Sequence, residues 1–157
     1  MISKKQNGFS LIELLIVVAI LLVIAAIAIP SFLRSKIAAN QASAVGSLRS
    51  LNTACVSYNT AYGQFPAVLT NLGPVGSGGI PTSTSADFID SVLAAGQKSG
   101  YNFTYAAGAS NQSYSIVATP IALATSGQNM YYTDQSGVIR VDTSGSGASA
   151  SSTPIGN

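Results

Sequence analysis

The stretch that organises this chain is GFSLIELLIVVAILLVIAAIAIP, at residues 8–30. Between Glu13 and Pro30 every residue is Leu, Ile, Val or Ala. The 21 residues from 9 to 29 would form a helix about 31 Å long at roughly 1.5 Å per residue, which matches a hydrocarbon core of about 30 Å. The sequence therefore predicts a membrane-spanning helix over 9–29.

Glu13 is the residue that does not suit a simple membrane anchor. A charged side chain within a spanning helix costs about 2.5–3.5 kcal/mol or more. The helix dipole stabilises an acid in the first turn by only about 0.3–1 kcal/mol, which is too little to offset its burial in lipid. We therefore expect the Glu13 carboxylate to acquire a charged partner.

The residues before the apolar run set its orientation. Lys4 and Lys5 stand just ahead of it, and positive charge favours the cytoplasmic side. The chain after Pro30 is therefore expected outside the cytoplasm. A secretory signal cut near Ala26-Ile27-Ala28 is an alternative, but Glu13 and the helical pattern after Pro30 favour retention of the segment.

The helix is predicted to continue past Pro30 as an amphipathic half over 30–62. Pro30 removes one helical hydrogen bond, so a kink or a local loosening is expected there. Gly63 and Pro66 are predicted to end the helix. Beyond Pro30, residues that recur at intervals of three and four predict one half-buried stripe: Ile37, Gln41, Ala44, Leu48, Leu51, Cys55, Tyr58 and Tyr62.

Residues 63–142 are predicted to form a small globular head. Ser85 has the character of an N-cap for a short helix over 86–95. Residues 143–157 are nearly all Ser, Gly, Ala and Thr, which predicts a flexible tail. The fold class is α+β: the second half of the long helix covers a small antiparallel sheet of about four strands. The strands are predicted at 101–105, 113–119, 130–133 and 138–141.

Composition argues against an enzyme. The chain has no histidine and one cysteine, Cys55, so neither a Ser-His-Asp triad nor a Cys-His pair can be assembled. No cofactor is expected, and no stretch is basic enough to predict specific nucleic-acid binding. No metal site is predicted apart from weak calcium candidates at Asp134 and Asp142, which have no further acidic residues clustered nearby.

The N-terminal third resembles the type IV pilins and the related pseudopilins of type II secretion. The resemblance is carried by Lys4-Lys5, by glycine immediately before Phe9, by Glu13 four residues later, and by Pro30 at the end of the apolar run. Near the C-terminus, YYTDQSGVIR at 131–140 is similar to the last hairpin of some pilins.

The resemblance implies how the N-terminus is processed and used. Residues 1–8 would be a leader that a prepilin peptidase removes between Gly8 and Phe9, and the new amine of Phe9 would be methylated. Glu13 would then pair with the positive N-terminus of a neighbouring copy. Pro30 would mark a region where the helix melts during assembly.

The resemblance also implies a place and a partner. The chain would wait in the lipid bilayer of the bacterial inner membrane as a single-pass protein with a cytoplasmic N-terminus. Inner-membrane assembly machinery would then build it into an extracellular pilus, a helical filament of identical subunits. The predicted function is that of the structural subunit of a type IV pilus, for adhesion, motility or DNA uptake. The alternatives are a major pseudopilin of a type II secretion system and a minor pilin with a binding role.

Overall fold

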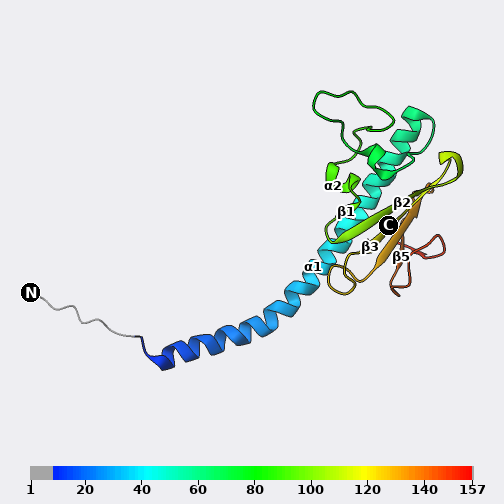
Figure 1. Cartoon of the computed structure of the whole chain (residues 1–157). Coiled ribbons are helices and arrows are strands. Elements are labelled where there is room, and N and C mark those ends of the chain that lie inside the picture. Colours follow the sequence, from blue (N-terminus) through cyan, green and yellow to red (C-terminus); the bar gives the residue numbers. More distant parts are fainter. Residues whose placement is uncertain (1–8, 157) are drawn as a thin grey trace, which may run out of the picture. The chain divides into compact units, whose positions relative to one another are not determined.

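The protein is represented by a computed structural model that describes residues 9–156. The chain divides into two units, Met1–Ser35 and Lys36–Asn157, and helix α1, Leu11–Tyr62, contributes to both (Figure 1). The remaining elements all lie in the second unit. They are the 3-10 helices η1 (Leu69–Leu72) and η2 (Ala109–Asn111), helix α2 (Ser91–Ala94), and strands β1 (Gln97–Lys98), β2 (Tyr101–Ala107), β3 (Tyr114–Pro120), β4 (Met130–Asp134), β5 (Arg140–Asp142) and β6 (Thr153–Pro154).

The limits of α1 follow from local chemistry. Pro30 lies inside the helix and does not end it. Gly63 follows the last helical residue with φ of +74°, a left-handed conformation that glycine adopts without the steric cost of a Cβ. The Gly63 N–H donates to the carbonyl of Asn59 at 2.8 Å. The predicted end of the helix at Gly63 is confirmed.

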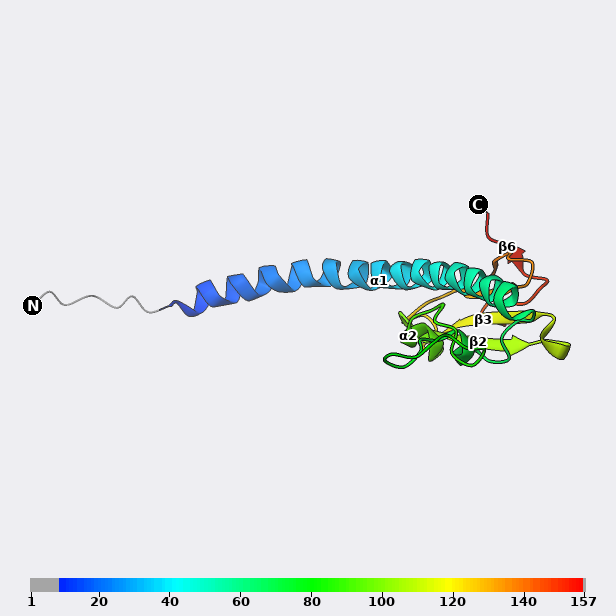
Figure 2. The ribbon, with the colours of Figure 1, turned by 90° about the horizontal axis from the view of Figure 1, so that it is seen from above.

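The hydrophobic core of the second unit lies between α1 and one face of the sheet (Figure 2). The predicted stripe is confirmed, because its central residues are the most deeply buried on the helix. These are Ala44, Leu48, Leu51, Cys55 and Tyr58. The strands bury alternate residues against them, as a sheet with one covered face requires. The buried apolar residues of the central strands are Tyr101, Phe103, Tyr114, Ile116, Ala118 and Tyr131.

The sheet has six antiparallel strands in the order β1-β2-β3-β4-β5-β6. The α+β fold is therefore confirmed, whereas the predicted number of about four strands is too low. The four predicted strands correspond to β2, β3, β4 and β5. The two additional strands have two residues each, too few to show the alternation by which a strand is predicted. They form because a neighbouring edge offers unpaired backbone groups.

Strand β6 lies within 143–157, the segment for which a flexible tail was expected. It is paired with β5, and the Ile155 N–H donates to the carbonyl of Ile139 at 2.8 Å. The Arg140 guanidinium donates from Nη1 to the carbonyl of Ser152 at 3.1 Å. The Ile155 side chain packs against the core. One apolar residue and the open edge of β5 thus give this Ser/Gly-rich stretch a defined path.

The short helix α2 is also shorter than the 86–95 predicted, and its cap is Asp90 rather than Ser85. The Asp90 Oδ1 atom accepts from the Leu93 N–H at 2.8 Å. The residues before Asp90 have a non-helical conformation and bond to another segment. Asp87 has φ of +58°, and its N–H donates to the carbonyl of Gly73 at 2.9 Å. Pairing with the loop after η1 therefore prevents a helix from starting at Ser85.

A buried polar network joins α1 to the sheet. The Asn52 side chain donates from Nδ2 to Thr133 Oγ1 at 2.8 Å, and its Oδ1 accepts from the Tyr114 hydroxyl at 3.0 Å. Thr133 Oγ1 in turn donates to the carbonyl of Val138 at 3.2 Å. Each of these buried groups is satisfied only in this register, so the network fixes how the helix sits on β3 and β4.

Candidate functional site

The candidate site is the apolar segment from Phe9 to Ile29, which the first unit leaves uncovered. The exposure of Phe9 is 79% and that of Leu11 is 82%. Fifteen large apolar side chains in this segment are at least 45% exposed: Phe9, Leu11, Ile12, Leu14, Leu15, Ile16, Val17, Val18, Ile20, Leu21, Leu22, Val23, Ile24, Ile27 and Ile29. Monomeric soluble proteins rarely expose a contiguous apolar surface of this kind, so the segment marks an interaction with lipid or protein.

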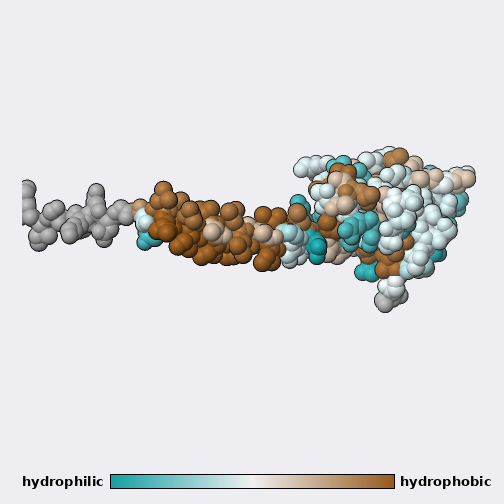
Figure 3. Space-filling view, turned by 90° about the horizontal axis from the view of Figure 1, so that it is seen from below, coloured by the Kyte–Doolittle hydropathy of each residue, from teal (hydrophilic) through white to brown (hydrophobic). Residues whose placement is uncertain are grey.

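The segment has the length and composition to cross a membrane. Among the described residues, α1 is the one helix that is apolar enough, with a mean hydropathy of 3.2 over its most apolar window. Figure 3 shows the segment as a continuous apolar surface on the face in view. The side chains around the helix are uniformly apolar, so any face of it can pack against lipid or against another apolar helix.

At the start of the segment the structure places Glu13 in a capping arrangement. Ser10 immediately precedes α1, and Glu13 is its third residue. The Glu13 Oε2 atom accepts from the backbone N–H of Ser10 at 2.9 Å, which satisfies a donor that the helix itself cannot satisfy. The carboxylate is exposed, and the ion pair found within residues 9–156 joins two other residues, Lys98 and Asp90. Charge pairing by Glu13 thus requires a partner beyond the described residues.

The structure brings some of the predicted site residues together and separates others. Phe9 and Glu13 lie at the same end of the apolar segment, whereas Pro30 is seventeen residues further along α1, or about 26 Å at 1.5 Å per residue. Gly8, Lys4 and Lys5 lie outside the described residues. Ser10 was missed, although the spacing Ser-x-x-Glu before an apolar run is a readable sign of a capping box.

The two weak calcium candidates do not share a site. Asp134 ends β4, while Asp142 is opposite Met130 at the other end of that strand, which separates them by about 14 Å at 3.4 Å per residue. Asp134 Oδ1 accepts from the Ser136 N–H at 2.9 Å, and Asp142 Oδ1 accepts from the Ser144 hydroxyl at 2.7 Å. Within residues 9–156 there is no group of three Asp, Glu, Cys or His side chains placed to hold a metal.

Hydrogen bonds within their own turns explain the charge state of these carboxyls. Those from the Ser144 side chain and backbone lower the pKa of Asp142. Partial burial alone would raise the pKa of Asp134, but hydrogen bonds from Ser136 outweigh it, so that this pKa is also lowered. Both side chains are therefore ionised turn residues that stabilise the hairpin ends.

Cys55 lies in the core and is not available for chemistry. Its side chain is fully buried, and burial raises the pKa of the thiol from 9.0 to about 12. Since the thiolate is the nucleophilic form, a thiol with this pKa is inert at neutral pH. The predicted position of Cys55 on the buried stripe of the helix is confirmed.

Comparison with known proteins agrees with these observations at the N-terminus. Residues 3–29 match the family described as the prokaryotic N-terminal methylation motif. The chain is also similar to the type IV major pilin protein PilA of Myxococcus xanthus (strain DK1622), with 38% identity over 71 residues. That match covers 45% of this chain and 32% of the relative, so the chain spans about a third of the length of the curated relative it matches. No solved structure gives a significant match.

Both matches concern pilin-type features. The methylation motif includes Gly8, Phe9 and Glu13, the residues that carried the resemblance drawn from the sequence. Together with the long N-terminal helix and the antiparallel sheet, they confirm the resemblance of this chain to the type IV pilins.

Proposed function

We propose that this chain is the structural subunit of an extracellular filament built from many identical copies, and that the filament is a type IV pilus. The single observation that carries the proposal is the exposed apolar segment from Phe9 to Ile29, with Glu13 as its one charged residue. A surface of this size is costly in water. It is stable in lipid, or when several copies bury it against one another.

The proposal gives the segment two successive environments. Before assembly the helix lies in the inner membrane, which covers its apolar side chains. Removal of residues 1–8 leaves Phe9 as the N-terminus, and its amine carries a positive charge whether or not it is methylated. During assembly the segment moves from lipid into the filament core, where small residues such as Ala19 and Ala26 permit close helix packing.

Glu13 supplies the polar contact in this scheme. In the single chain its carboxylate accepts from the Ser10 N–H, and this contact leaves the negative charge uncompensated. The amine of Phe9 in a neighbouring copy would compensate it. An ion pair that is removed from water stabilises only when both partners are present, and an orphaned charge is strongly destabilising. A copy that is out of register would leave Glu13 unpaired, so this contact favours one axial register between subunits.

The similarity to a type IV major pilin favours a pilus over the pseudopilus of a secretion system. The two would differ in the product observed. A pilus subunit yields long surface filaments that can be sheared from cells, whereas a pseudopilin supports the release of other proteins. The test is therefore made in a host that carries a prepilin peptidase and a pilus assembly system.

The test combines processing and assembly of the wild-type chain with a Glu13→Gln variant. Intact mass of the sheared filament subunit should give a chain that begins at Phe9 and carries one methyl group. Glu13→Gln keeps the size and hydrogen-bonding reach of the side chain but removes its charge. We expect this variant to be cleaved and inserted normally, and the sheared filament fraction to fall at least about tenfold, since the loss of one buried charge partner costs several kcal/mol.

Asp87→Asn is the matched control, because it makes the same charge change on the exposed surface of the head. Asparagine also tolerates the left-handed conformation of residue 87. This control should leave the filament fraction unchanged. Normal filaments from Glu13→Gln would reject the pairing role. A mature chain that begins after Ala28 would reject the whole scheme.

A further inference from the structure

Two apolar side chains are exposed on the loop between β3 and β4, residues 121–127, which we call the β3–β4 loop. Ile121 is 54% exposed and Leu123 is 53% exposed. The other residues from 121 to 126 are Ala, Ser or Thr. Neither of the two large side chains belongs to the core cluster of the second unit. The loop therefore presents isolated aliphatic groups on an otherwise small and polar surface.

Hydrogen bonds within the β3–β4 loop fix its conformation. The Ala124 N–H donates to the carbonyl of Gly127 at 2.8 Å, and the Ser126 hydroxyl donates to the carbonyl of Ala122 at 3.0 Å. Ala124 has φ of +64°, a conformation that an alanine keeps only where the surrounding structure requires it. The exposure of the two aliphatic side chains is therefore a built feature of the loop.

The β3–β4 loop is attached to α1 near the start of the second unit (Figure 1). The Asn40 side chain donates from Nδ2 to the carbonyl of Ser126 at 2.8 Å. Asn40 follows Leu33, the last large apolar side chain of the exposed run, by seven residues of the same helix. This separation is about 10 Å along α1 at 1.5 Å per residue. The continuity of the helix thus keeps the loop close to the end of the apolar run.

A bilayer that covers the apolar run would bring its headgroups to about this height on α1. The headgroup layer adds about 5–7 Å on each side of the hydrocarbon core, and a spanning helix is tilted by about 20° on average. A tilt toward the β3–β4 loop would lower the loop into that layer. Aliphatic side chains at this depth leave water and become buried at the boundary between headgroups and acyl chains.

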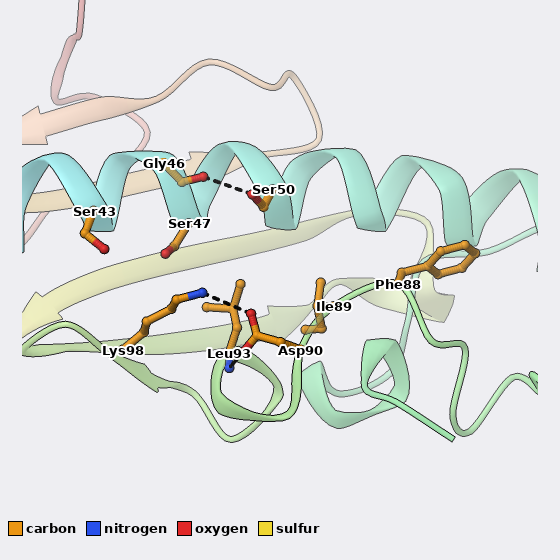
Figure 4. Close-up of a pocket in the computed structure, with 9 residues that line it drawn as sticks. All are labelled: Ser43, Gly46, Ser47, Ser50, Phe88, Ile89, Asp90, Leu93 and Lys98. Carbon is orange, nitrogen blue, oxygen red and sulfur yellow. Dashed lines mark hydrogen bonds and ion pairs between the residues drawn. The ribbon is translucent and has the colours of Figure 1, made fainter. Parts of the chain in front are cut away.

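Lys36 adds a positive charge at the same end of the second unit. It lies one turn before Asn40 on α1, it is exposed, and it forms no ion pair within residues 9–156. Lys98, beside α2, differs, because its Nζ atom pairs with Asp90 Oδ2 at 3.0 Å (Figure 4). An uncompensated ammonium near exposed aliphatic side chains is the combination that binds anionic lipid at a membrane surface.

The size of this surface favours lipid over a second protein. Two half-exposed side chains are far below the roughly 1,000 Å² that a specific protein interface buries. A weak contact with lipid is sufficient, because an anchored helix already holds the second unit at the membrane. We propose that Lys36, Ile121 and Leu123 form a membrane-contact surface that lies on anionic lipid headgroups before assembly. The proposal rests on the membrane-anchored stage of the proposed function.

The test uses single tryptophans, because the chain contains none. The full chain is reconstituted in vesicles of phosphatidylcholine and phosphatidylglycerol that carry a quenching spin label, either at the headgroup or on the acyl chain. Leu123→Trp reports on the membrane-contact surface. Ile80→Trp is the matched control, since Ile80 is 82% exposed. The Tyr58 hydroxyl donates to the carbonyl of Ser83 at 2.6 Å, which places the loop of this control at the opposite end of the buried half of α1.

A third reporter separates insertion of the helix from contact by the second unit. Val18→Trp lies within the apolar run, and the acyl-chain label should quench it wherever the helix spans the bilayer. We expect the headgroup label to quench Leu123→Trp at least about threefold more than Ile80→Trp, because a tryptophan held at the interface lies beside the label. The preference of tryptophan for the interface is common to both variants, so it does not account for the difference.

The charge contribution is measured in the Leu123→Trp chain. Lys36→Gln should lower the equilibrium constant for contact about fivefold in vesicles with phosphatidylglycerol, the effect of one lysine near an anionic surface. It should have little effect in phosphatidylcholine alone. Lys98→Gln is the control, because this lysine is paired with Asp90, and it should leave the quenching unchanged. Equal effects of the two substitutions would remove Lys36 from the surface.

The three reporters give distinct outcomes. Equal quenching of Leu123→Trp and Ile80→Trp, in vesicles where Val18→Trp is quenched, would overturn the membrane contact and leave the anchored helix intact. Absence of quenching of Val18→Trp would reject the anchored stage and this proposal with it. A blue shift of Leu123→Trp that grows with protein density, without quenching by either lipid label, would overturn the lipid contact in favour of a contact between copies.

Discussion

The two halves of α1 differ in how their apolar side chains are buried. Between Leu11 and Ser35 every large apolar side chain is exposed, whereas from Lys36 onward the same helix buries a single stripe against the sheet. Leu22 is 65% exposed and Leu51 is fully buried, although both are leucines in the interior of one helix. The difference is that the second half packs against the sheet, whereas the side chains of the first half remain exposed.

The comparison shows that hydrophobicity alone does not assign a side chain to a core. In the second half, polar residues such as Arg49 and Ser50 alternate with the apolar stripe, and this asymmetry selects one face for burial. The first half has no such asymmetry, so its own fold cannot cover it. An apolar surface of this kind is typical of a segment that lipid or another protein covers.

The largest expected effect on stability comes from replacing a leucine by alanine in each half of α1. Leu51→Ala should lower the free energy of unfolding of the second unit by about 2–5 kcal/mol, because it removes a fully buried side chain and leaves a cavity. Leu22→Ala should change it by less than about 0.5 kcal/mol, because Leu22 has no contact to lose in that unit. Urea unfolding in micelles, followed by near-ultraviolet circular dichroism of the tyrosines, measures both. Equal losses would contradict the distinction between the halves.

The next effect tests the polar contact that fixes α1 on the sheet. Asn52→Ala should cost about 1–3 kcal/mol, because in a buried site it leaves the Tyr114 hydroxyl without its acceptor and removes the donor to Thr133 Oγ1. Thr53→Ala is the neighbouring control, since its hydroxyl bonds only to the carbonyl of Arg49 on the exposed side of the helix. The same urea unfolding experiment applies. A cost for Asn52→Ala no larger than that for Thr53→Ala would show that the network contributes no stability.

A smaller loss of stability is expected at alkaline pH, and it comes from Cys55 in the buried half of α1. The Cys55 thiol has its pKa raised by burial to about 12 in the folded chain, against 9.0 for an ordinary thiol. Its contribution to stability is therefore complete below pH 9 and is lost as the pH rises toward 12, since the unfolded chain releases the proton first. At pH 10 the loss is about 1.4 kcal/mol.

Comparison with Cys55→Ala isolates this contribution, because the buried tyrosines also have raised pKa values and ionise in the unfolded chain. Burial raises the pKa of Tyr101, Tyr105 and Tyr114 in the same direction. The wild type should therefore lose more stability between pH 8 and pH 10 than the variant does. Parallel pH profiles for the two chains would contradict the assignment to the thiol.

The smallest effect concerns charge on the surface of the head. Lys98→Ala removes the partner of Asp90 but leaves the N-cap bond from Asp90 to Leu93 intact. The expected cost is about 0–1 kcal/mol, because both side chains are exposed and the pair is screened by salt. Asp90→Ala removes the cap as well and should cost about 0.5–2 kcal/mol. Thermal unfolding at low and high salt separates the two, and a larger effect for Lys98→Ala would reverse this order.

Several features were predicted from particular residues. The recurrence from Ala44 to Tyr58 predicted which side of α1 is buried, and the strands predicted at 130–133 and 138–141 correspond to the hairpin of β4 and β5. The predictions were less accurate for short elements whose limits depend on backbone hydrogen bonds to other segments. Strands β1 and β6 are too short to be seen in a pattern, and α2 begins at Asp90 because loop pairing occupies the residues before it.

The sequence by itself determined the long helix, its uniformly apolar first half, the buried stripe of its second half and the motif around Gly8, Phe9 and Glu13. These are local properties: they depend on the order and spacing of side chains along one element. Only the tertiary structure decided the sixth strand and the contact of Asn52 with Tyr114 and Thr133. Each of these requires residues far apart in the chain to meet, and the geometry of that meeting is set by packing rather than by any single segment.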